Sequence, residues 1–103
     1  MKTPLIIDNR GDLLVFRSKI DAESYLEAVD VQNGEYRGFD AEGRPLLFET
    51  EGGWVNVKIN PASPADPADL QHVLQEFVFR ATGRELESLE ELLLFVDRYA
   101  ISV

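Results

Sequence analysis

The sequence has no cysteine and a single histidine, His72, among its 103 residues. Without thiols, the chain can form neither a disulfide bond nor a thiolate metal site. A lone imidazole leaves almost no way to assemble a nucleophile and its general base, or a zinc site of the ordinary type. We therefore expect a protein that is not an enzyme, with no catalytic residue, no metal and no cofactor.

Basic side chains are also scarce: 10 lysines and arginines stand against 19 aspartates and glutamates, and the net charge is -9. No cluster of Lys or Arg offsets the repulsion from phosphates or anionic headgroups, so we expect no nucleic-acid and no membrane partner. A macromolecular partner is expected to be a basic protein. The alternative is that the excess acid only keeps the protein dispersed.

Long hydrophobic runs are absent as well. The run Leu5-Ile6-Ile7 ends at Asp8, whereas a secretory signal needs about 7 to 15 apolar residues. The longest later run, residues 92–96, is far short of the roughly 20 residues that span a bilayer. The sequence therefore predicts a cytoplasmic protein.

The chain does contain enough apolar surface for one core, since 45% of its residues are hydrophobic. We expect a single domain over residues 1–103. Residues 5–8 and 13–17 are β-prone and flank a cluster of turn formers, which predicts a hairpin. Apolar residues at helical spacing then predict a helix over 21–29 that is capped by Ser18 or Asp21.

From residue 35 the apolar pattern changes to a period of two. Residues 35–40, 45–51 and 54–60 are separated by glycine-containing turns, which predicts an antiparallel meander. In the last of these strands the valines point to one side, so Trp54 is an aromatic residue on the polar face.

Two helices are predicted after the proline-rich connector that follows the meander. Asp66-Pro67 is a strong start for the first helix, which ends at Thr82-Gly83. Ser88 with Glu91 forms a capping box for the second, which reaches about Tyr99. The predicted fold is α+β: an antiparallel sheet of about five strands with both C-terminal helices packed on one face.

Phe79 lies about opposite the centre of the apolar stripe of the first C-terminal helix, beside His72, Gln75 and Glu76. Either the last helix or the proline-rich connector covers it, or it anchors an interaction patch with Glu76 as a charged rim. His72 and Glu76 have the spacing of a side-chain pair, but no third metal ligand lies nearby in the sequence. The candidate partner-binding residues are Phe79, Glu76, His72 and Trp54.

The final helix has apolar residues on two sides, because Leu94 and Ile101 lie off its main apolar face. It therefore needs a second neighbour, which is either the preceding helix or another protein chain. The preceding helix is the simpler answer in a small domain, so we expect a monomer rather than a homodimer.

The remaining acidic and glycine-rich positions favour structure over chemistry. Acidic pairs such as Glu90-Glu91, or Asp66 and Asp69, lie where they favour a helix dipole, and acid–base work would require a raised pKa in a cleft. No glycine pair precedes a helix with Lys and Ser or Thr behind it, so no nucleotide site is predicted.

Residues 24–48 contain Tyr25-Leu26-Glu27 in a helix, followed by Asp30-Val31, Asn33-Gly34-Glu35-Tyr36 and Asp40-Ala41-Glu42-Gly43-Arg44. This stretch resembles small bacterial immunity proteins that are encoded beside secreted polymorphic toxins. The resemblance implies a cytoplasmic protein that binds a cognate toxin and blocks it, often by covering a basic nuclease surface with acidic side chains. No binding residue is carried over, because the similar positions are mainly turns and core positions.

The function we expect is therefore a non-catalytic acidic inhibitor of the immunity type, which occludes a basic toxin. Acidic side chains would steer the encounter, and Phe79 or Trp54 would slow dissociation. Two alternatives stay open. One is a small enzyme or ligand-binding domain that gathers carboxylates in a sheet cleft with His72, and the other is a homo-oligomer with Leu94 and Ile101 in its interface.

Overall fold

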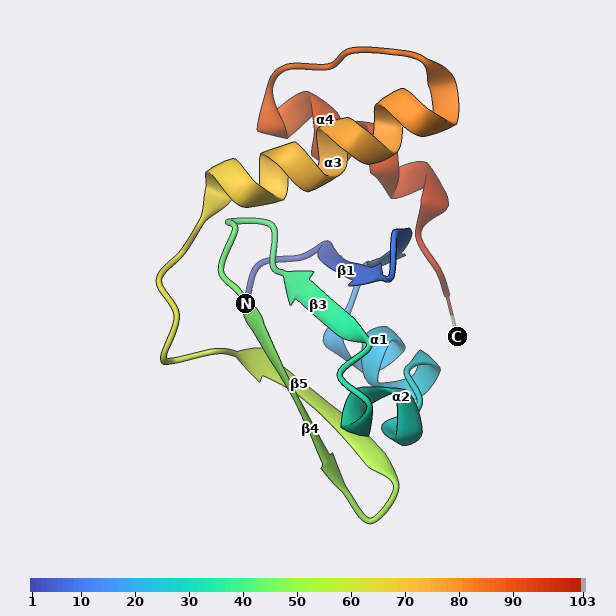
Figure 1. The fold of residues 1–103 in the computed structure, drawn as a ribbon, viewed down its shortest axis with the longest axis vertical. Helices are drawn as coiled ribbons and strands as arrows, with labels where there is room; N and C mark the ends of the chain where they lie inside the picture. The colour runs from blue at the N-terminus through green and yellow to red at the C-terminus, as the bar shows by residue number, and fades with distance from the viewer. Residues whose placement is uncertain (103) are drawn as a thin grey trace.

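The computed structural model describes residues 1–102, and its elements alternate between two small sheets and four α-helices (Figure 1). In chain order these are β1 (Leu5–Asn9), β2 (Asp12–Phe16), α1 (Lys19–Tyr25), α2 (Ala28–Gln32), β3 (Tyr36–Phe39), β4 (Leu46–Glu51), β5 (Trp54–Ile59), α3 (Pro67–Thr82), α4 (Leu89–Val96) and the 3-10 turn η1 (Asp97–Tyr99). The strands pair in antiparallel fashion. The predicted α+β class is confirmed.

The first sheet has the strand order β2-β1-β3. The predicted N-terminal hairpin is present. In its turn, the Oδ1 atom of Asp8 accepts a hydrogen bond from the backbone N–H of Gly11 at 2.8 Å. Arg10 and Gly11 both have positive φ there, at 52° and 95°, which is the geometry of a tight hairpin turn. β3 adds to the other edge of β1, with Phe39 opposite Ile6.

β4 and β5 form a separate two-stranded sheet, so the predicted meander is interrupted between β3 and β4. An isolated bridge between Phe39 and Pro45 is the remaining backbone link between the two sheets in the described part of the chain. The reason is that β3 pairs with the distant strand β1 over four residues, and the chain then turns away through residues 40–44. Spacing along the sequence cannot reveal this non-local pairing.

The helix predicted over residues 21–29 is wrong as a single unit, because the chain breaks it into α1 and α2. Leu26 and Glu27 adopt extended backbone angles between the two helices. The break lets the buried Leu26 and the flanking Ala28 and Val31 pack on the same apolar cluster. Ser18, one of the two predicted caps, is the N-cap of α1.

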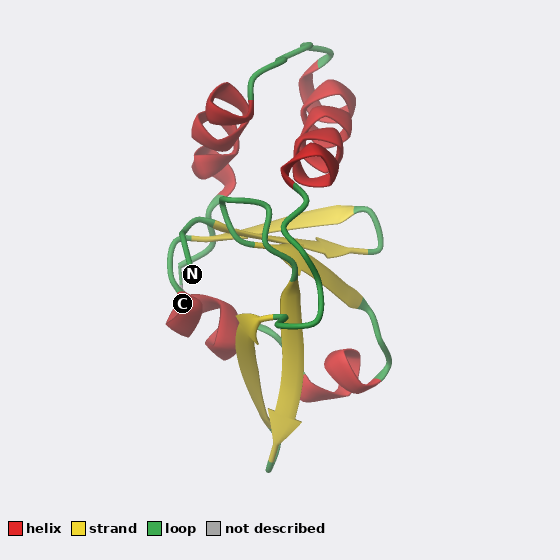
Figure 2. Cartoon of the chain, turned by 90° about the vertical axis from the view of Figure 1, so that its left-hand side faces the viewer, coloured by secondary structure: helices red, strands yellow, loops and turns green. Residues whose placement is uncertain are grey.

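α3 and α4 pack side by side over one face of the three-stranded sheet, as predicted (Figures 1 and 2). The apolar stripe of α3 and the inner face of α4 enclose one core with residues of all three strands, namely Ile6, Val15, Phe39, Leu70, Leu74, Val78, Leu92, Phe95 and Val96. Within residues 1–102, none of the helices is both long enough and apolar enough to cross a membrane.

A second core lies on the other face of the sheet, where α1, α2 and the β4–β5 hairpin cover it. Its buried residues include Leu5, Ile7 and Phe16 of the first sheet and Val55 and Val57 of β5. The predicted alternation of β5 is confirmed, since these valines are buried whereas Trp54 is exposed. The three-stranded sheet is therefore buried on both faces.

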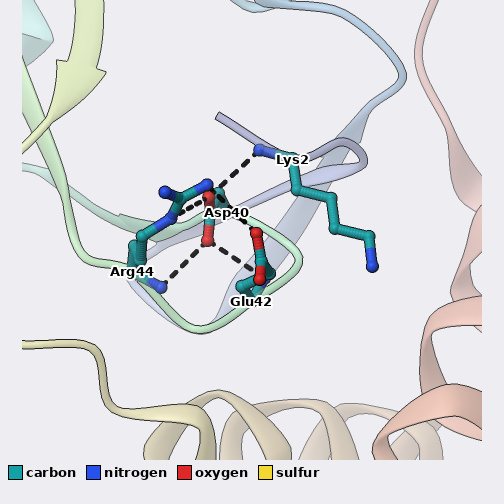
Figure 3. Close-up of polar contacts among 4 residues, drawn as sticks. All are labelled: Lys2, Asp40, Glu42 and Arg44. Atoms are coloured by element: carbon teal, nitrogen blue, oxygen red, sulfur yellow. Dashed lines mark hydrogen bonds and ion pairs between the residues drawn. The ribbon is translucent and has the colours of Figure 1, made fainter.

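Asp40 fixes the loop between β3 and β4, and among residues 1–102 it is the only charged residue that is fully buried (Figure 3). Its Oδ1 atom accepts the backbone N–H groups of Glu42 and Arg44 at 3.0 and 2.9 Å. Its Oδ2 atom accepts the backbone N–H of Lys2 at 3.1 Å and the Nε of Arg44 at 2.8 Å. Burial alone would raise the pKa of Asp40, but these donors outweigh it and lower the pKa below its usual value.

The same loop contacts the start of α3. Gly43 has φ +79°, its carbonyl accepts the N–H of Asp66 at 2.7 Å, and a Cβ at this position would lie 2.5 Å from the Cα of Pro67. Only glycine fits both the left-handed backbone and this close approach. The contact sets where α3 begins and therefore where its outer face points.

Candidate protein-binding groove

The outer face of α3 and the chain segment 84–88 enclose an open groove with a volume of about 340 Å³. Four of its lining residues come from α3 and three from the segment that follows it: His72, Gln75, Glu76, Phe79, Glu85, Leu86 and Glu87. The groove lies on the side of α3 that does not face the sheet.

The helical repeat explains how α3 supplies its four residues. His72, Gln75, Glu76 and Phe79 stand at positions i, i+3, i+4 and i+7, so they form one stripe along the helix. Asp66 caps the helix by accepting the N–H of Asp69 at 3.0 Å, which fixes the register of this stripe. Phe79 keeps 53% of its surface exposed, so neither the last helix nor the connector covers it.

Two glutamines of α3 hold the opposite wall in place. Gly83 ends α3 in the left-handed conformation, and the chain then runs back along the helix. The Nε2 of Gln75 donates to the carbonyl of Leu86 at 3.3 Å, and the Nε2 of Gln71 donates to the carbonyl of Glu87 at 2.5 Å. Both glutamines bind backbone carbonyls, so the side chains of residues 85–87 stay free to line the groove.

The groove is strongly acidic. Glu76, Glu85 and Glu87 contribute three carboxylates, and the Nε2 of His72 lies 3.2 Å from the Oε1 of Glu76. This contact confirms the predicted His72–Glu76 side-chain pair. No Lys or Arg lines the groove among the residues that the structure describes.

The two arginines nearest in sequence are directed elsewhere. Arg80 donates to the carbonyls of Glu76 and Gly11, which turns its guanidinium toward the β1–β2 turn. Arg84 lies over the ring of Phe95, with its Cζ atom 5.4 Å from the ring centroid. Neither arginine lines the groove, although Arg80 shares the adjoining cavity with Glu76. Among residues 1–102, Glu76, Glu85 and Glu87 form no ion pair with an arginine or lysine.

The structure gathers three of the four predicted partner-binding residues, Phe79, Glu76 and His72, in this groove. Trp54 lies elsewhere. It opens β5 directly after the turn of the β4–β5 hairpin, which lies at the end of the molecule opposite to α3 and α4 (Figures 1 and 2). With 79% of its surface exposed, Trp54 forms a separate aromatic site.

The sequence interpretation missed Glu85, Leu86 and Glu87. Their place in the groove depends on the chain reversal at Gly83 and on the two glutamine bonds to the segment. A signal was available, because only four residues separate Gly83 from the helix cap Ser88. A connection this short forces the segment to stay beside α3.

The acidic pairs at helix starts have structural roles. Asp66 is the cap of α3, and Ser88 accepts the N–H of Glu91 at 3.0 Å while its Oγ donates to the Oε1 of Glu91 at 3.1 Å. The predicted cap at Ser88 is thus confirmed, but the Glu91 carboxylate accepts the Ser88 hydroxyl and not the backbone N–H that a full capping box uses. α4 ends at Val96 and continues only as the turn η1.

A different pair of carboxylates, Glu35 and Asp30, interacts near the second core. A hydrogen bond with Asp30, burial and the negative charge of Asp30 raise the pKa of Glu35, although the opposite charge of Arg10 lies 3.3 Å away. Asp30 also accepts the Tyr36 hydroxyl at 3.2 Å. Within residues 1–102, no group of three or more histidine or acidic side chains is placed to hold a metal.

The two residues expected off the main face of the final helix have different surroundings, because Leu94 lies in α4 and Ile101 lies beyond η1. Leu94 keeps 72% of its surface exposed. Ile101 packs against the second core, and its N–H donates to the carbonyl of Val15 at 2.7 Å. Ile101 is thus partly buried against its own chain, and the homo-oligomer through both residues stays a prediction.

No family model matches the chain, and the searches of curated proteins and of solved structures likewise found no match.

Proposed function

We propose that this chain is a non-catalytic, cytoplasmic binding protein that docks a basic protein on the acidic groove of α3, and most concretely an immunity-type inhibitor of a toxin. The observation that carries the proposal is Phe79, a large aromatic side chain half-exposed in a groove with three carboxylates. The resemblance of residues 24–48 to immunity proteins supplies the class of partner.

The aromatic ring supplies an anchor. Interfaces concentrate their binding energy in a few buried aromatic or arginine side chains, and loss of such an anchor typically costs about 2 kcal/mol or more. Phe79 and Leu86 are the apolar side chains that line the groove, beside the carboxylates of Glu76, Glu85 and Glu87, and Leu86 also packs against the first core. This combination of apolar and charged side chains is typical of a protein-binding surface.

The charge supplies steering. The net charge of -9 and the three carboxylates of the groove attract a basic partner over several ångströms of solvent, and this raises the association rate most at low ionic strength. A basic nuclease surface fits this field because it carries the positive charge that binds phosphates. Occlusion by an acidic protein blocks such a surface without any chemical step.

The test is co-expression with proteins encoded beside the gene, with cell survival and co-purification as readouts. The wild-type chain is expected to rescue cells and to form a complex whose affinity falls as salt rises. Phe79→Ser is expected to weaken the complex by about 30-fold or more, since the loss of about 2 kcal/mol from an anchor corresponds to that factor. Trp54→Ser is the matched variant, because it removes an exposed aromatic at the other end of the molecule.

Three results would contradict the proposal. One is that no neighbouring protein binds the wild-type chain at low salt or is neutralised by it. Another is that Phe79→Ser neutralises as well as wild type. The third is that Trp54→Ser alone abolishes the complex, which would move the binding site to the β4–β5 hairpin.

A further inference from the structure

Arginine side chains stack on phenylalanine rings at two places in this fold. On β3, the guanidinium of Arg37 lies 5.2 Å from the ring centroid of Phe39 and forms an ion pair with Asp69 of α3. The arrangement combines one guanidinium, one ring face and one carboxylate. It contributes both cation–π attraction and charge-assisted hydrogen bonding.

The second place is Phe95 of α4. Arg98 lies 4.0 Å and Arg84 5.4 Å from its ring centroid. Phe95 is almost entirely buried under these guanidinium groups and the core, with 7% of its surface exposed. At both places, an arginine guanidinium lies over a phenylalanine ring and shields it from solvent.

The acidic groove has the ring and the carboxylates of such a site but no arginine in its lining. Phe79 is half-exposed and shares the groove with Glu76, Glu85 and Glu87. Arg80 and Arg84, which are close in sequence, are held at the β1–β2 turn and over Phe95. Among residues 1–102, the lining of the groove contains neither Arg nor Lys, so the lining itself offers no guanidinium for the Phe79 ring.

We infer that the groove is a receptor for an arginine side chain that the basic partner presents. This inference rests on the proposed function and adds the chemistry of the contact. The guanidinium plane would stack on Phe79, its N–H groups would pair with Glu76 or Glu85, and its aliphatic stem would pack on Leu86. Lysine fits less well, because its strongly hydrated ammonium has no planar face to lay on the ring.

The test compares two peptides of about 12 residues that differ only in their cations: arginines in one and lysines in the other, on the same alanine and leucine background. Each is titrated at low salt into the full chain, and backbone amide NMR shifts are recorded. The arginine peptide is expected to shift amides of residues 72–87. It is also expected to bind about 2- to 5-fold more tightly than its lysine counterpart.

Variants then separate the ring from the charge. Phe79→Leu keeps an apolar side chain but removes the π face, so it is expected to bring the affinities of the two peptides together. Glu85→Gln keeps the shape but removes a carboxylate, so it is expected to weaken both peptides. Trp54→Leu is the control and is expected to change neither affinity. Unchanged amide dispersion outside the groove confirms that each variant folds.

Equal affinity for the two peptides in the wild-type chain would overturn the inference, as would unchanged arginine selectivity in Phe79→Leu. Shifts centred on the β4–β5 hairpin would overturn it too. If both peptides bind equally in the groove while neutralisation still depends on Phe79, the arginine receptor fails and the proposed function stands. If the groove selects arginine but no neighbouring toxin is neutralised, the proposed inhibitor fails and the receptor stands.

Discussion

Replacement of Asp40 by asparagine is the sharpest test of how this fold is held together. The amide side chain of Asp40→Asn would keep one acceptor oxygen for two of the four donors, but its NH₂ group would face the two others. Two hydrogen bonds to a buried charge are lost, and each is worth about 1.5 to 3 kcal/mol. Arg44 is partly exposed and recovers some hydration, so we expect a net loss of about 3 kcal/mol.

The loss is measured by urea unfolding followed by far-UV circular dichroism, because the exposed Trp54 is a poor fluorescence probe of unfolding. The same change lowers Tm by about 12 to 24 °C in a domain of this size. Asp97→Asn is the matched control: Asp97 also pairs with an arginine, Arg17, but at the surface, so its loss is expected to be much smaller.

The pH dependence of the Asp40→Asn difference follows from linkage. The folded-state pKa of Asp40 is lowered, so its stabilisation is complete above the unfolded value of about 3.9 and is lost as the pH falls through the folded value. The stability gap between wild type and variant is expected to be constant from about pH 5 to 8. Between the unfolded and the folded pKa value it should narrow, by at most about 1.4 kcal/mol per pH unit. A loss equal to that of Asp97→Asn, or a gap that does not narrow in acid, would refute this reasoning.

Three further predictions concern two glycine turns, the Ser88 cap and the Glu35–Asp30 pair. Gly43→Ala is expected to lower the free energy of unfolding by about 3 kcal/mol, because of the left-handed backbone and the 2.5 Å contact with the start of α3. Gly34→Ala also has positive φ but meets open space, so its expected loss is about 1 kcal/mol. Equal losses of the two variants in urea unfolding would contradict this. Ser88→Ala should cost about 1 kcal/mol through loss of the α4 cap, and an unchanged unfolding midpoint would argue against it. Glu35→Gln should raise stability at neutral pH, because a raised pKa means that ionised Glu35 disfavours the folded state. This gain should vanish in acid, where both states are protonated, and a variant less stable than wild type at neutral pH would disprove it.

Local signals predicted much of the fold. The hairpin, the Asp66-Pro67 helix start and the Ser88 helix cap depend on a few neighbouring residues, and all are present. The pairing of β3 with β1 and the break at Leu26 depend on contacts between distant parts of the chain. Such non-local packing overrides short-range periodicity, so the sequence pattern could not predict it.

The candidate site was predictable to the extent that it is helical. The spacing of His72, Glu76 and Phe79 on one stripe follows from about 3.6 residues per turn, and the structure keeps them together. Trp54 is a candidate because it is an aromatic on the polar face of its strand, but it opens β5 directly after the β4–β5 turn, and that turn lies at the end of the molecule opposite to α3 (Figure 1). Tertiary arrangement, not composition, decides which exposed aromatics share a surface.

Hydrogen–deuterium exchange of the complex with its co-purified protein partner tests most directly whether the acidic groove is the binding surface. The proposal predicts that amides of α3 and of residues 84–88 gain protection, and that this protection weakens when salt is raised or Phe79 is replaced by Ser. Protection confined to the β4–β5 hairpin, with the outer face of α3 exchanging as in the free protein, would contradict it.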